Sequence, residues 1–583
     1  MDRRKFIQIF GGSLLTPFVL NSPAQGNALS KLTLEGKNFS LNAKVEAEGL
    51  HQASHFSQTN AESVFDLSVA SGDPSESGVI LWTHIHESEY DGLSSLFFQV
   101  SRVEDFSVVE MEGQVLASDF SAERDYTVKL DLHGLLQAGS TYFYRFVYRN
   151  TVSRTGRCKT LPREDQALES LRIAVLTCQD YTTGFFNAYH HLAMEELDFV
   201  VHLGDFIYEY AQYVGFEHAL VRSLSLPSGE NVAFSLEDYR YIYRKFREDK
   251  NLQLAMERHT FIITWDDHET ANDVYWDYLR DTLGAPDHPF STDPVFDRDP
   301  DLLRQLKLDA QRAWLEFVPA RIQLDESAEH PHDFLKIYRS FKIGNLVELF
   351  MTDSRTYRSE QPCKDGTAWE NWTCKDYEAE TQTMLGQEQK QWLIDGLTQS
   401  KARWKVWGNQ TLLAQLAVTS LGHQIAYVNY DAWDGYQFER QEIMRAVKNN
   451  EVDNFVVLTG DLHTAIASYL KIDYGNINNW DYSNLVGIEV MTPSITSPNL
   501  QDNIANAVNI NDDLRALFNS GARLNNPHIK DFNSSIYGYT VMEFGHKELR
   551  WDVFDIDKRE DNPMTEKHLY RSFRYNPNWM WIY

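Results

Sequence analysis

The sequence has no long apolar run, little cysteine and a deficit of basic residues. None of its apolar stretches approaches the roughly 20 residues that a membrane-spanning helix needs. Four cysteines in 583 residues are too few for a disulfide scaffold, and an apolar content of 43% excludes a disordered chain or a collagen-like fibre. Only 54 lysines and arginines oppose 84 acidic residues, so the net charge is −30. Such an acidic surface repels nucleic acid and anionic lipid, and we expect no nucleic-acid complex.

The chain begins with a pattern typical of export signals. Arg3 and Arg4 precede a short apolar core at 9–20, and small residues follow up to Ala28. This pattern predicts a twin-arginine signal peptide over residues 1–28, with the twin-arginine translocation machinery as a partner and a periplasmic or secreted location. The alternative is a short buried N-terminal helix, but two adjacent arginines are an unfavourable start for a helix of the core. Cargo of this route crosses folded, so bound metals can travel with it.

The cysteines fall into two groups. Cys363 and Cys374 are close in sequence and predict a loop-closing disulfide, with two free surface thiols as the alternative. Cys158 and Cys178 are left over. Either these two pair, or at least one of them is kept for another role.

Two patterns divide the rest of the chain, which is long enough for two to four domains of about 150 residues. Polar residues at 29–62 predict a linker or arm, and short strands with turn residues at 63–163 predict an antiparallel β-sandwich. At 164–555, short apolar runs alternate with amphipathic helices, which predicts layered α/β sheets. The polar, aromatic residues 556–583 are expected to form a tail.

Polar side chains follow four of the apolar runs. They are Cys178 and Asp180; Asp205, Tyr208 and Glu209; Asp266, Asp267, His268 and Glu269; and Asp461 and His463. Sites in open α/β sheets form beyond the carboxyl ends of strands, so we expect these residues to meet. Each motif alone fits an ordinary turn, an inert thiol or a structural histidine. Together they are metal ligands of mixed softness, which predicts two different metals.

These motifs resemble a known family. Gly-Asp-x-x-Tyr, Trp-Asp-Asp-His-Glu and Gly-Asp-x-His, with a Cys-Gln strand end before them, are similar to motifs of the PhoD-type alkaline phosphatases and phosphodiesterases of the calcineurin-like metallophosphatase superfamily. The resemblance continues at 68–74, 353–358, 386–389 and 431–436, and so covers nearly the whole mature chain. It implies an α/β fold, a four-layer αββα metallophosphatase sandwich, preceded by an antiparallel β-sandwich domain.

The resemblance implies a first metal site that holds ferric iron. Asp205 would bridge this metal and a second one. The other ligands would be a thiolate, a phenolate and an imidazole from Cys178, Tyr208 and His463. The phenolate is the ligand that implies ferric iron.

A second metal site is implied at Asp267 and Asp461. Carboxylates make this site hard, so one or two calcium ions fit it better than zinc, with zinc and manganese left open. His268 would be the catalytic acid or the group that stabilises the transition state. Asn272 and Asn409 are further calcium candidates, with satisfied turn amides as the alternative interpretation.

The function that follows is an exported, metal-dependent hydrolase of small phosphate mono- or diesters. Metal-bound hydroxide would attack phosphorus, and the inorganic phosphate released would be taken up. Arg240 and Arg244 are candidates for phosphate binding, with solvated helix positions as the alternative. Other hypotheses are a phospholipase D-like phosphodiesterase and a non-catalytic cell-surface binding protein. A serine hydrolase lacks support, because the sequence has no Gly-x-Ser-x-Gly motif.

Overall fold

The computed structural model describes residues 40–41, 60–213, 219–322, 324–325, 327–328, 330–363, 374–420, 423–475, 483–502 and 512–583. The predicted signal peptide at 1–28 and nearly all of the predicted arm at 29–62 lie outside these residues. Within the described ranges, no helix combines the length and the apolar character needed to cross a membrane.

A ten-stranded sheet runs through the molecule. Its order is β27-β26-β25-β24-β10-β11-β12-β2-β3-β6, and β10, β11, β12 and β2 are parallel neighbours. The strands are β2 (Val69–Ser75), β3 (Gly78–His84), β6 (Thr127–Asp131), β10 (Ser170–Leu176), β11 (Phe199–His202), β12 (Thr260–Ile263), β24 (Gly538–Gly545), β25 (Leu549–Ile556), β26 (Lys567–Asn576) and β27 (Trp581–Ile582).

A seven-stranded sheet packs against the first one. Its order is β15-β16-β17-β20-β22-β21-β23, and β16, β17, β20 and β22 are parallel. The strands are β15 (Arg339–Ile343), β16 (Val347–Met351), β17 (Trp404–Gly408), β20 (Phe455–Thr459), β21 (Ala465–Lys471), β22 (Leu485–Met491) and β23 (Ile529–Asn533). The strands that were predicted as apolar runs are buried on both faces, because a second layer covers each side.

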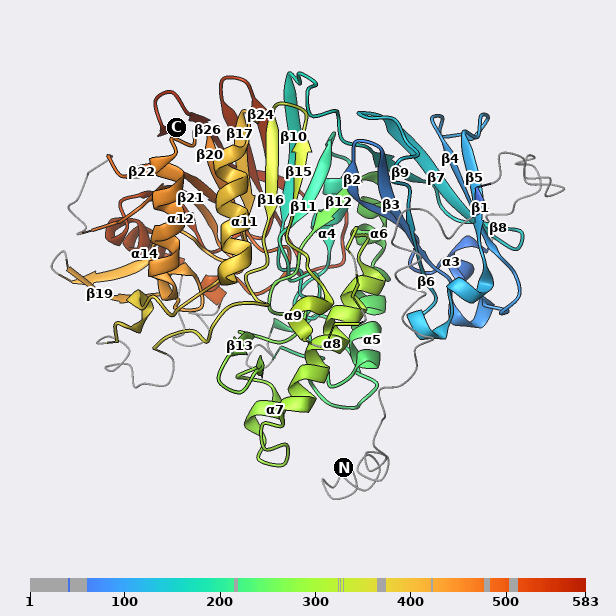
Figure 1. Ribbon diagram of the computed structural model, residues 1–583, viewed down its shortest axis with the longest axis horizontal. Coiled ribbons are helices and arrows are strands. Elements are labelled where there is room, and N and C mark those ends of the chain that lie inside the picture. Colours follow the sequence, from blue (N-terminus) through green and yellow to red (C-terminus); the bar gives the residue numbers. More distant parts are fainter. Residues whose placement is uncertain are drawn as a thin grey trace.

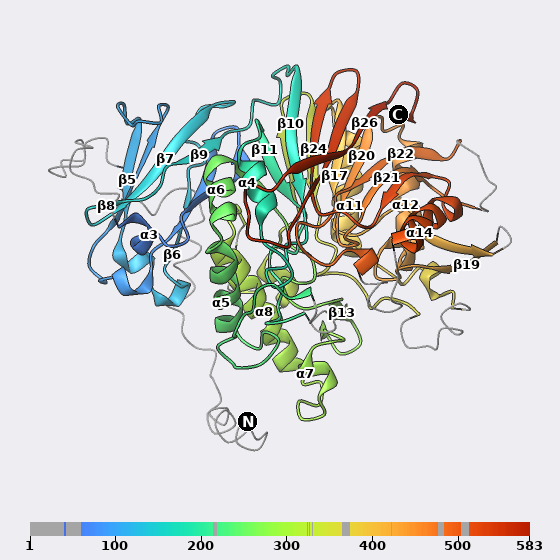
Figure 2. The ribbon, with the colours of Figure 1, turned by 180° about the vertical axis from the view of Figure 1, so that it is seen from behind.

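Three apolar cores hold four layers together. The middle core joins the two sheets, for example through Val175 and Val201 of the first sheet and Val406 and Val456 of the second. A second core joins the ten-stranded sheet to α4 (Asn187–Ala193), α5 (Leu236–Arg247), α6 (Lys250–Arg258) and α8 (Pro300–Phe317). A third joins the seven-stranded sheet to α11 (Gly386–Gln399), α12 (Gln437–Asn449) and α14 (Asp512–Asn525). The predicted αββα arrangement is confirmed, and Figures 1 and 2 show its helical layers on opposite flanks.

The N-terminal region shares a sheet with the body. Its own sheet contains β1 (Ser40–Leu41), β4 (Leu96–Ser101), β5 (Met111–Val115), β7 (Thr141–Tyr148), β8 (Thr151–Val152) and β9 (Gly156–Lys159), and it packs on β2, β3 and β6. Alternate residues of β2 and β3 face different cores: Ala70 and Trp82 pack with the helices, whereas Val69 and Leu81 pack in the N-terminal core. The expected boundary near residue 163 therefore does not separate two sheets.

The C-terminal residues complete the ten-stranded sheet. The segment expected to be a tail after residue 555 instead contributes β26, which pairs with β25 over most of its length, and β27. Alternating side chains such as Phe573 and Tyr575 are buried against the middle core, which explains why the segment joins the sheet.

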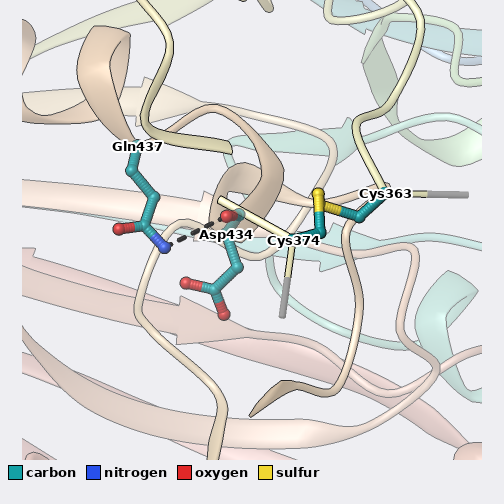
Figure 3. Close-up of a disulfide and its surroundings, with 4 residues drawn as sticks. All are labelled: Cys363, Cys374, Asp434 and Gln437. Carbon is teal, nitrogen blue, oxygen red and sulfur yellow. Dashed lines mark hydrogen bonds between the residues drawn. A yellow bond between two sulfur atoms is a disulfide. The ribbon is translucent and has the colours of Figure 1, made fainter. Parts of the chain in front are cut away.

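Smaller elements complete the described chain. They are α3 (Ala61–Val64), α7 (Pro289–Thr292), α9 (Pro331–Phe334), the hairpin β13 (Tyr275–Asp277) and β14 (Thr282–Gly284), and the hairpin β18 (Ala417–Ser420) and β19 (His423–Tyr427). A disulfide joins Cys363 to Cys374 beside Asp434 and Gln437 at the start of α12 (Figure 3). Cys158 and Cys178 are both free and buried, so the two do not pair with each other.

Candidate functional site

Four strand ends meet where the two sheets pack together. β10, β11 and β12 are neighbours in the ten-stranded sheet, and β20 belongs to the seven-stranded sheet. The residues after them place ligand-type atoms within 4.8 Å of one another in three groups: Cys178, Asp205 and His463; Asp205, Asp267 and His268; and Asp266, Asp267 and Asp461. Because Asp205 and Asp267 each belong to two groups, the three groups form one continuous centre.

The backbone of this centre is strained. Cys178, Asp205, Asp461 and His463 have φ angles of 56°, 55°, 65° and 53°. This left-handed region is uncommon for residues other than glycine. Such residues cost about 1–3 kcal/mol each and cluster at functional sites. The fold thus favours the placement of these four side chains over local backbone stability.

Two glycines let the strand ends approach one another. A Cβ on Gly204, whose φ is +113°, would lie 2.5 Å from the backbone nitrogen of Asp266. A Cβ on Gly460 would lie 2.4 Å from Oγ1 of Thr177. The atoms that leave no room for a side chain belong to neighbouring strand ends. This explains the Gly-Asp pair at both ends.

Glu269 ties two strand ends together. Its carboxylate accepts hydrogen bonds from the backbone N–H groups of Asp205 at 3.0 Å, Phe206 at 2.6 Å and Asp266 at 2.7 Å. Burial raises the pKa of Glu269 to about 8. The carboxyl group therefore sets the relative position of the residues after β11 and β12.

Tyr208 lies beside two members of the first group, Asp205 and His463. Tyr208 Oη lies 3.1 Å from Asp205 Oδ2 and 3.3 Å from His463 Nε2, and Ser497 Oγ donates to it at 2.5 Å. His463 Nδ1 lies 2.6 Å from the carbonyl oxygen of Pro498, which fixes the ring and leaves Nε2 facing the group. Burial lowers the pKa of His463 to about 4, so the imidazole is neutral at pH 7.

One guanidinium lies among the carboxylates of the group formed by Asp266, Asp267 and Asp461. Arg355 Nη2 lies 3.0 Å from Asp461 and 3.6 Å from Asp267, its Nη1 lies 2.7 Å from Asp431, and its Nε contacts Asp266. Burial disfavours the charge of Arg355, but these carboxylates outweigh burial and raise its pKa well above the usual value. Arg355 thus contacts four carboxylates, of which, in the described part of the chain, Asp431 alone also pairs with a second buried guanidinium, that of Arg358.

His268 is held by three consecutive residues after β11. Its ring lies 4.1 Å from the ring of Tyr208 and meets the ring of Tyr210 edge-on at 5.7 Å. Its Nδ1 lies 2.8 Å from Glu209 Oε2. Burial lowers its pKa, but the carboxylates of Glu209 and its neighbours outweigh burial and raise it well above the usual value. The engaged Nδ1 leaves Nε2 for a further partner.

The centre contains more negative groups than the protein neutralises. Asp205 Oδ1 and Asp267 Oδ1 are buried and have no hydrogen-bond partner among the described residues. Burial, reinforced by neighbouring carboxylates, raises the pKa of Asp205 and Asp461 well above the usual range. Burial also raises the pKa of Cys178. Unpaired buried carboxylates cost several kcal/mol each, and bound metal ions remove that cost, so the donor set fits metal ions.

Two predicted binding residues lie elsewhere. Arg240 forms a two-pronged ion pair with Glu316, at 2.6 and 2.7 Å. Arg244 pairs with Asp125 and with Glu237. Both arginines are neutralised where α5 meets the N-terminal region and α8. The structure therefore does not bring them to the centre. Arg240 is also buried, so the alternative of a solvated helix position does not describe it.

Three further polar residues near the strand ends form hydrogen bonds with other groups of the protein. Asp180 accepts hydrogen bonds from Thr182 and Thr183. The side-chain amide of Asn272 donates to Asp287, and that of Asn409 donates to a backbone carbonyl two residues on. Asn409 therefore has the local amide contact that its alternative interpretation describes, whereas the amide of Asn272 is bonded to a more distant residue.

Several residues of the centre were missed from the sequence. Arg355 and Asp431 lie far from the other motifs along the chain, and only the family resemblance at 353–358 and 431–436 marked their surroundings. Tyr210 follows Glu209 in the segment after Asp205, where the alternation of aromatic and acidic residues could have drawn attention to it.

The fold and the centre define a class of protein, a phosphoric ester hydrolase built on the metallophosphatase sandwich. The family model described as "PhoD-like phosphatase" matches residues 173–553, and the model "PhoD-like phosphatase, N-terminal domain" matches residues 39–162. The chain therefore belongs to the PhoD-like phosphatase family.

Individual proteins agree with this assignment. Alkaline phosphatase D of Bacillus subtilis (strain 168) is 32% identical over 441 residues, which are 74% of this chain and 69% of the relative. A solved structure titled "Structure of PhoD" matches with a TM-score of 0.73 and 28% identity, over 89% of this chain and 92% of that one.

Proposed function

We propose that this phosphatase is a metal-dependent hydrolase of phosphate mono- and diesters that acts outside the cytoplasm. One observation carries the proposal. Three groups of ligand-type atoms are linked through Asp205 and Asp267, and the Oδ1 atom of each of these two residues has no hydrogen-bond partner among the described residues. The name of the Bacillus relative, an alkaline phosphatase, supports the substrate class. Inorganic phosphate released by the reaction would be available for uptake.

The donor types support ferric iron in the first group. Cys178, Tyr208 and His463 offer a thiolate, a phenolate and a neutral imidazole around Asp205. Soft and strongly basic ligands of this kind suit a transition metal. In this assignment Asp205 is shared with the second metal, because its carboxylate belongs to both groups.

Calcium suits the carboxylates beside the iron site, because Asp267 and Asp461 offer oxygen ligands and Asp205, which shares a group with Asp267, offers another. Asp266 lies in the group of Asp267 and Asp461, and Arg355 contacts all three of these carboxylates. When bound, the two metals would neutralise phosphate oxygens and lower the pKa of a coordinated water. They would also reverse the local sign of an acidic protein, so that an anionic ester can enter.

His268 is the proposed proton donor to the leaving oxygen. Glu209 holds Nδ1 and stabilises the protonated ring, which leaves Nε2–H to be donated. Proton transfer by a positioned side chain requires this kind of fixed geometry. The rings of Tyr208 and Tyr210 restrict rotation of the imidazole. Glu209 is therefore a positioning residue, and His268 is the catalytic one.

Rates on three substrates test this function. We expect the metal-loaded enzyme to hydrolyse p-nitrophenyl phosphate and bis(p-nitrophenyl) phosphate, to lose both activities after metal stripping and to regain them with iron and calcium. The same assay on phosphatidylcholine vesicles separates a phospholipase D-like activity. Hydrolysis of the lipid alone would contradict the proposal, and so would unchanged rates after complete metal removal.

Export by the twin-arginine route is part of the proposal and is supported by Arg3 and Arg4 before a short apolar run. We expect replacement of both arginines by lysine to leave the unprocessed protein in the cytoplasm. Unchanged processing outside the cytoplasm would show that another route carries it.

A further inference from the structure

A buried loop after β22, residues 494–498, contacts the residues proposed to hold iron. The backbone N–H of Ser497 donates to the carbonyl oxygen of Cys178 at 3.3 Å. The carbonyl oxygen of Pro498 lies 2.6 Å from Nδ1 of His463. Because Cys178 follows β10 and His463 follows β20, the 494–498 loop links a strand end of one sheet to a strand end of the other.

The side chain of Ser497 contacts a third proposed ligand. Its Oγ accepts a hydrogen bond from the backbone N–H of Asp180 at 3.1 Å and lies 2.5 Å from Tyr208 Oη. Tyr208 directs its own hydrogen to Asp205 Oδ2 at 3.1 Å, so Ser497 supplies the hydrogen that joins the two hydroxyls. A serine hydroxyl carries one hydrogen, and here that hydrogen is donated to the oxygen that would bind the metal.

The surrounding chain fixes the position of this hydroxyl. Ser494 Oγ donates to the carbonyl oxygen of Ser497 at 2.8 Å. Thr496 Oγ1 donates to the carbonyl oxygen of Asp180 at 2.6 Å, and Nζ of Lys558, between β25 and β26, donates to the carbonyl oxygen of Thr496. Ser497 has no exposed surface, so bulk water does not compete for its hydrogen. The direction of its hydrogen bond is therefore set by the fold of the loop and not by Tyr208 alone.

We propose that Ser497 is a positioning residue of the iron site, whose hydroxyl donates a hydrogen bond to Tyr208 Oη, orients the phenolate and limits how strongly its oxygen donates electrons to iron. The inference rests on the proposed function, which assigns Tyr208 as a ligand of ferric iron. It adds a residue that acts through a ligand and is not itself one. Groups that form hydrogen bonds with a metal ligand fix its orientation and tune the metal.

The colour of the iron site would report this hydrogen bond. Phenolate bound to ferric iron absorbs visible light because the light moves an electron from the phenolate to the iron. A hydrogen bond to the phenolate oxygen stabilises the electrons that are moved, so it raises the energy of the transition. Loss of the hydrogen bond should therefore shift the band to longer wavelength.

The visible spectra of iron-loaded Ser497→Ala and Ser497→Thr test the proposal. For Ser497→Ala we expect the band at longer wavelength. We also expect the dissociation constant for iron, measured by competition with a chelator, to rise roughly 10- to 100-fold. Ser497→Thr keeps a hydroxyl on the same carbon, so its band and its iron affinity should stay close to those of the wild type.

The same loop offers a matched control in Ser494. This residue is also fully buried, and its Oγ donates to a backbone carbonyl and not to a proposed ligand. Ser494→Ala removes the same atom from the same loop and keeps the hydroxyl that contacts Tyr208. We expect its melting temperature to fall while the band stays at the wild-type position.

An unchanged band in Ser497→Ala would overturn the inference, and so would an equal shift in Ser494→Ala, which would assign the effect to loop packing. If Ser497→Ala takes up no iron, Ser497→Thr decides: iron binding at wild-type strength supports the proposal, and loss of iron contradicts it. In each of these cases, a coloured wild type that hydrolyses phosphate esters leaves the proposed function standing. A colourless wild type that hydrolyses these esters without iron would overturn both the inference and the iron assignment.

Discussion

Two acidic clusters of this protein differ in how their charge is balanced. At the junction of the N-terminal region and the body, each carboxylate has its own guanidinium: Asp73 pairs with Arg339, Asp131 with Arg321, and Glu316 with Arg240. At the strand ends, Asp266, Asp267 and Asp461 share Arg355, and Asp205 has no basic side chain bonded to it among the described residues.

The difference separates structural acids from functional ones. Two-pronged arginine pairs satisfy a carboxylate completely and hold packed elements in register. The strand-end cluster instead keeps two buried carboxylate oxygens that have no hydrogen-bond partner in the described part of the chain, together with a strained backbone. A protein retains such features where a ligand completes them, so the unbalanced cluster is where metal ions are expected.

The largest effect is expected from Asp205→Asn. This change removes the carboxylate charge shared by both metal groups while keeping its shape. We expect iron and calcium to be lost together and activity to fall to background, as measured by elemental analysis and ester hydrolysis. A variant that retains both metals would contradict the bridging role.

A smaller loss is expected from His268→Ala, because this residue is proposed to act on the substrate and not on the metals. kcat for alkyl phosphate esters should fall roughly 10²- to 10⁴-fold, with metal content unchanged. The loss should be smaller for nitrophenyl esters, whose leaving oxygen needs little protonation. Since His268 also lies in a ligand-type group, stoichiometric metal loss would identify it as a ligand instead.

The most direct comparison of the two clusters uses Arg339→Gln and Arg355→Gln. Breaking a buried ion pair costs about 3–5 kcal/mol of stability, so both variants should melt at lower temperature. For Arg339→Gln the loss should be the same in chelator and in calcium, because no metal can replace that guanidinium. For Arg355→Gln, calcium should recover part of the loss by neutralising the same carboxylates. Equal responses of the two variants to calcium would remove the distinction between the clusters.

Much of this architecture could be predicted from the sequence because the signals are local. Each buried strand has a short apolar run in the sequence, and the polar residues that follow these runs indicate the edge of the sheet where the site lies. Cys178, Asp205 and His463 met as expected, although their roles as ligands stay predictions.

The missed features depend on contacts between distant residues. β2 joins the body's sheet through β12, about 190 residues later in the chain, so the pairing leaves no local pattern. A Cβ on Gly72 would lie 2.9 Å from the carbonyl oxygen of Phe261 on β12, and this glycine is the one trace of the close approach. Arg355 reaches the centre from after β16, and nothing in its immediate sequence indicates four acidic partners. β26, between β27 and β25, is rich in polar residues and much of it is exposed, so it lacks the continuous apolar run that marks the inner strands.

The central claim is that the unbalanced strand-end cluster is a metal centre. Elemental analysis and the visible absorption spectrum of the purified protein test it most directly. The account predicts iron and calcium in the protein, together with a visible band from the Tyr208 phenolate bound to ferric iron that disappears when iron is removed. A colourless protein that contains two zinc ions would contradict the assignment of the metals. A metal-free protein with full phosphatase activity would contradict the central claim.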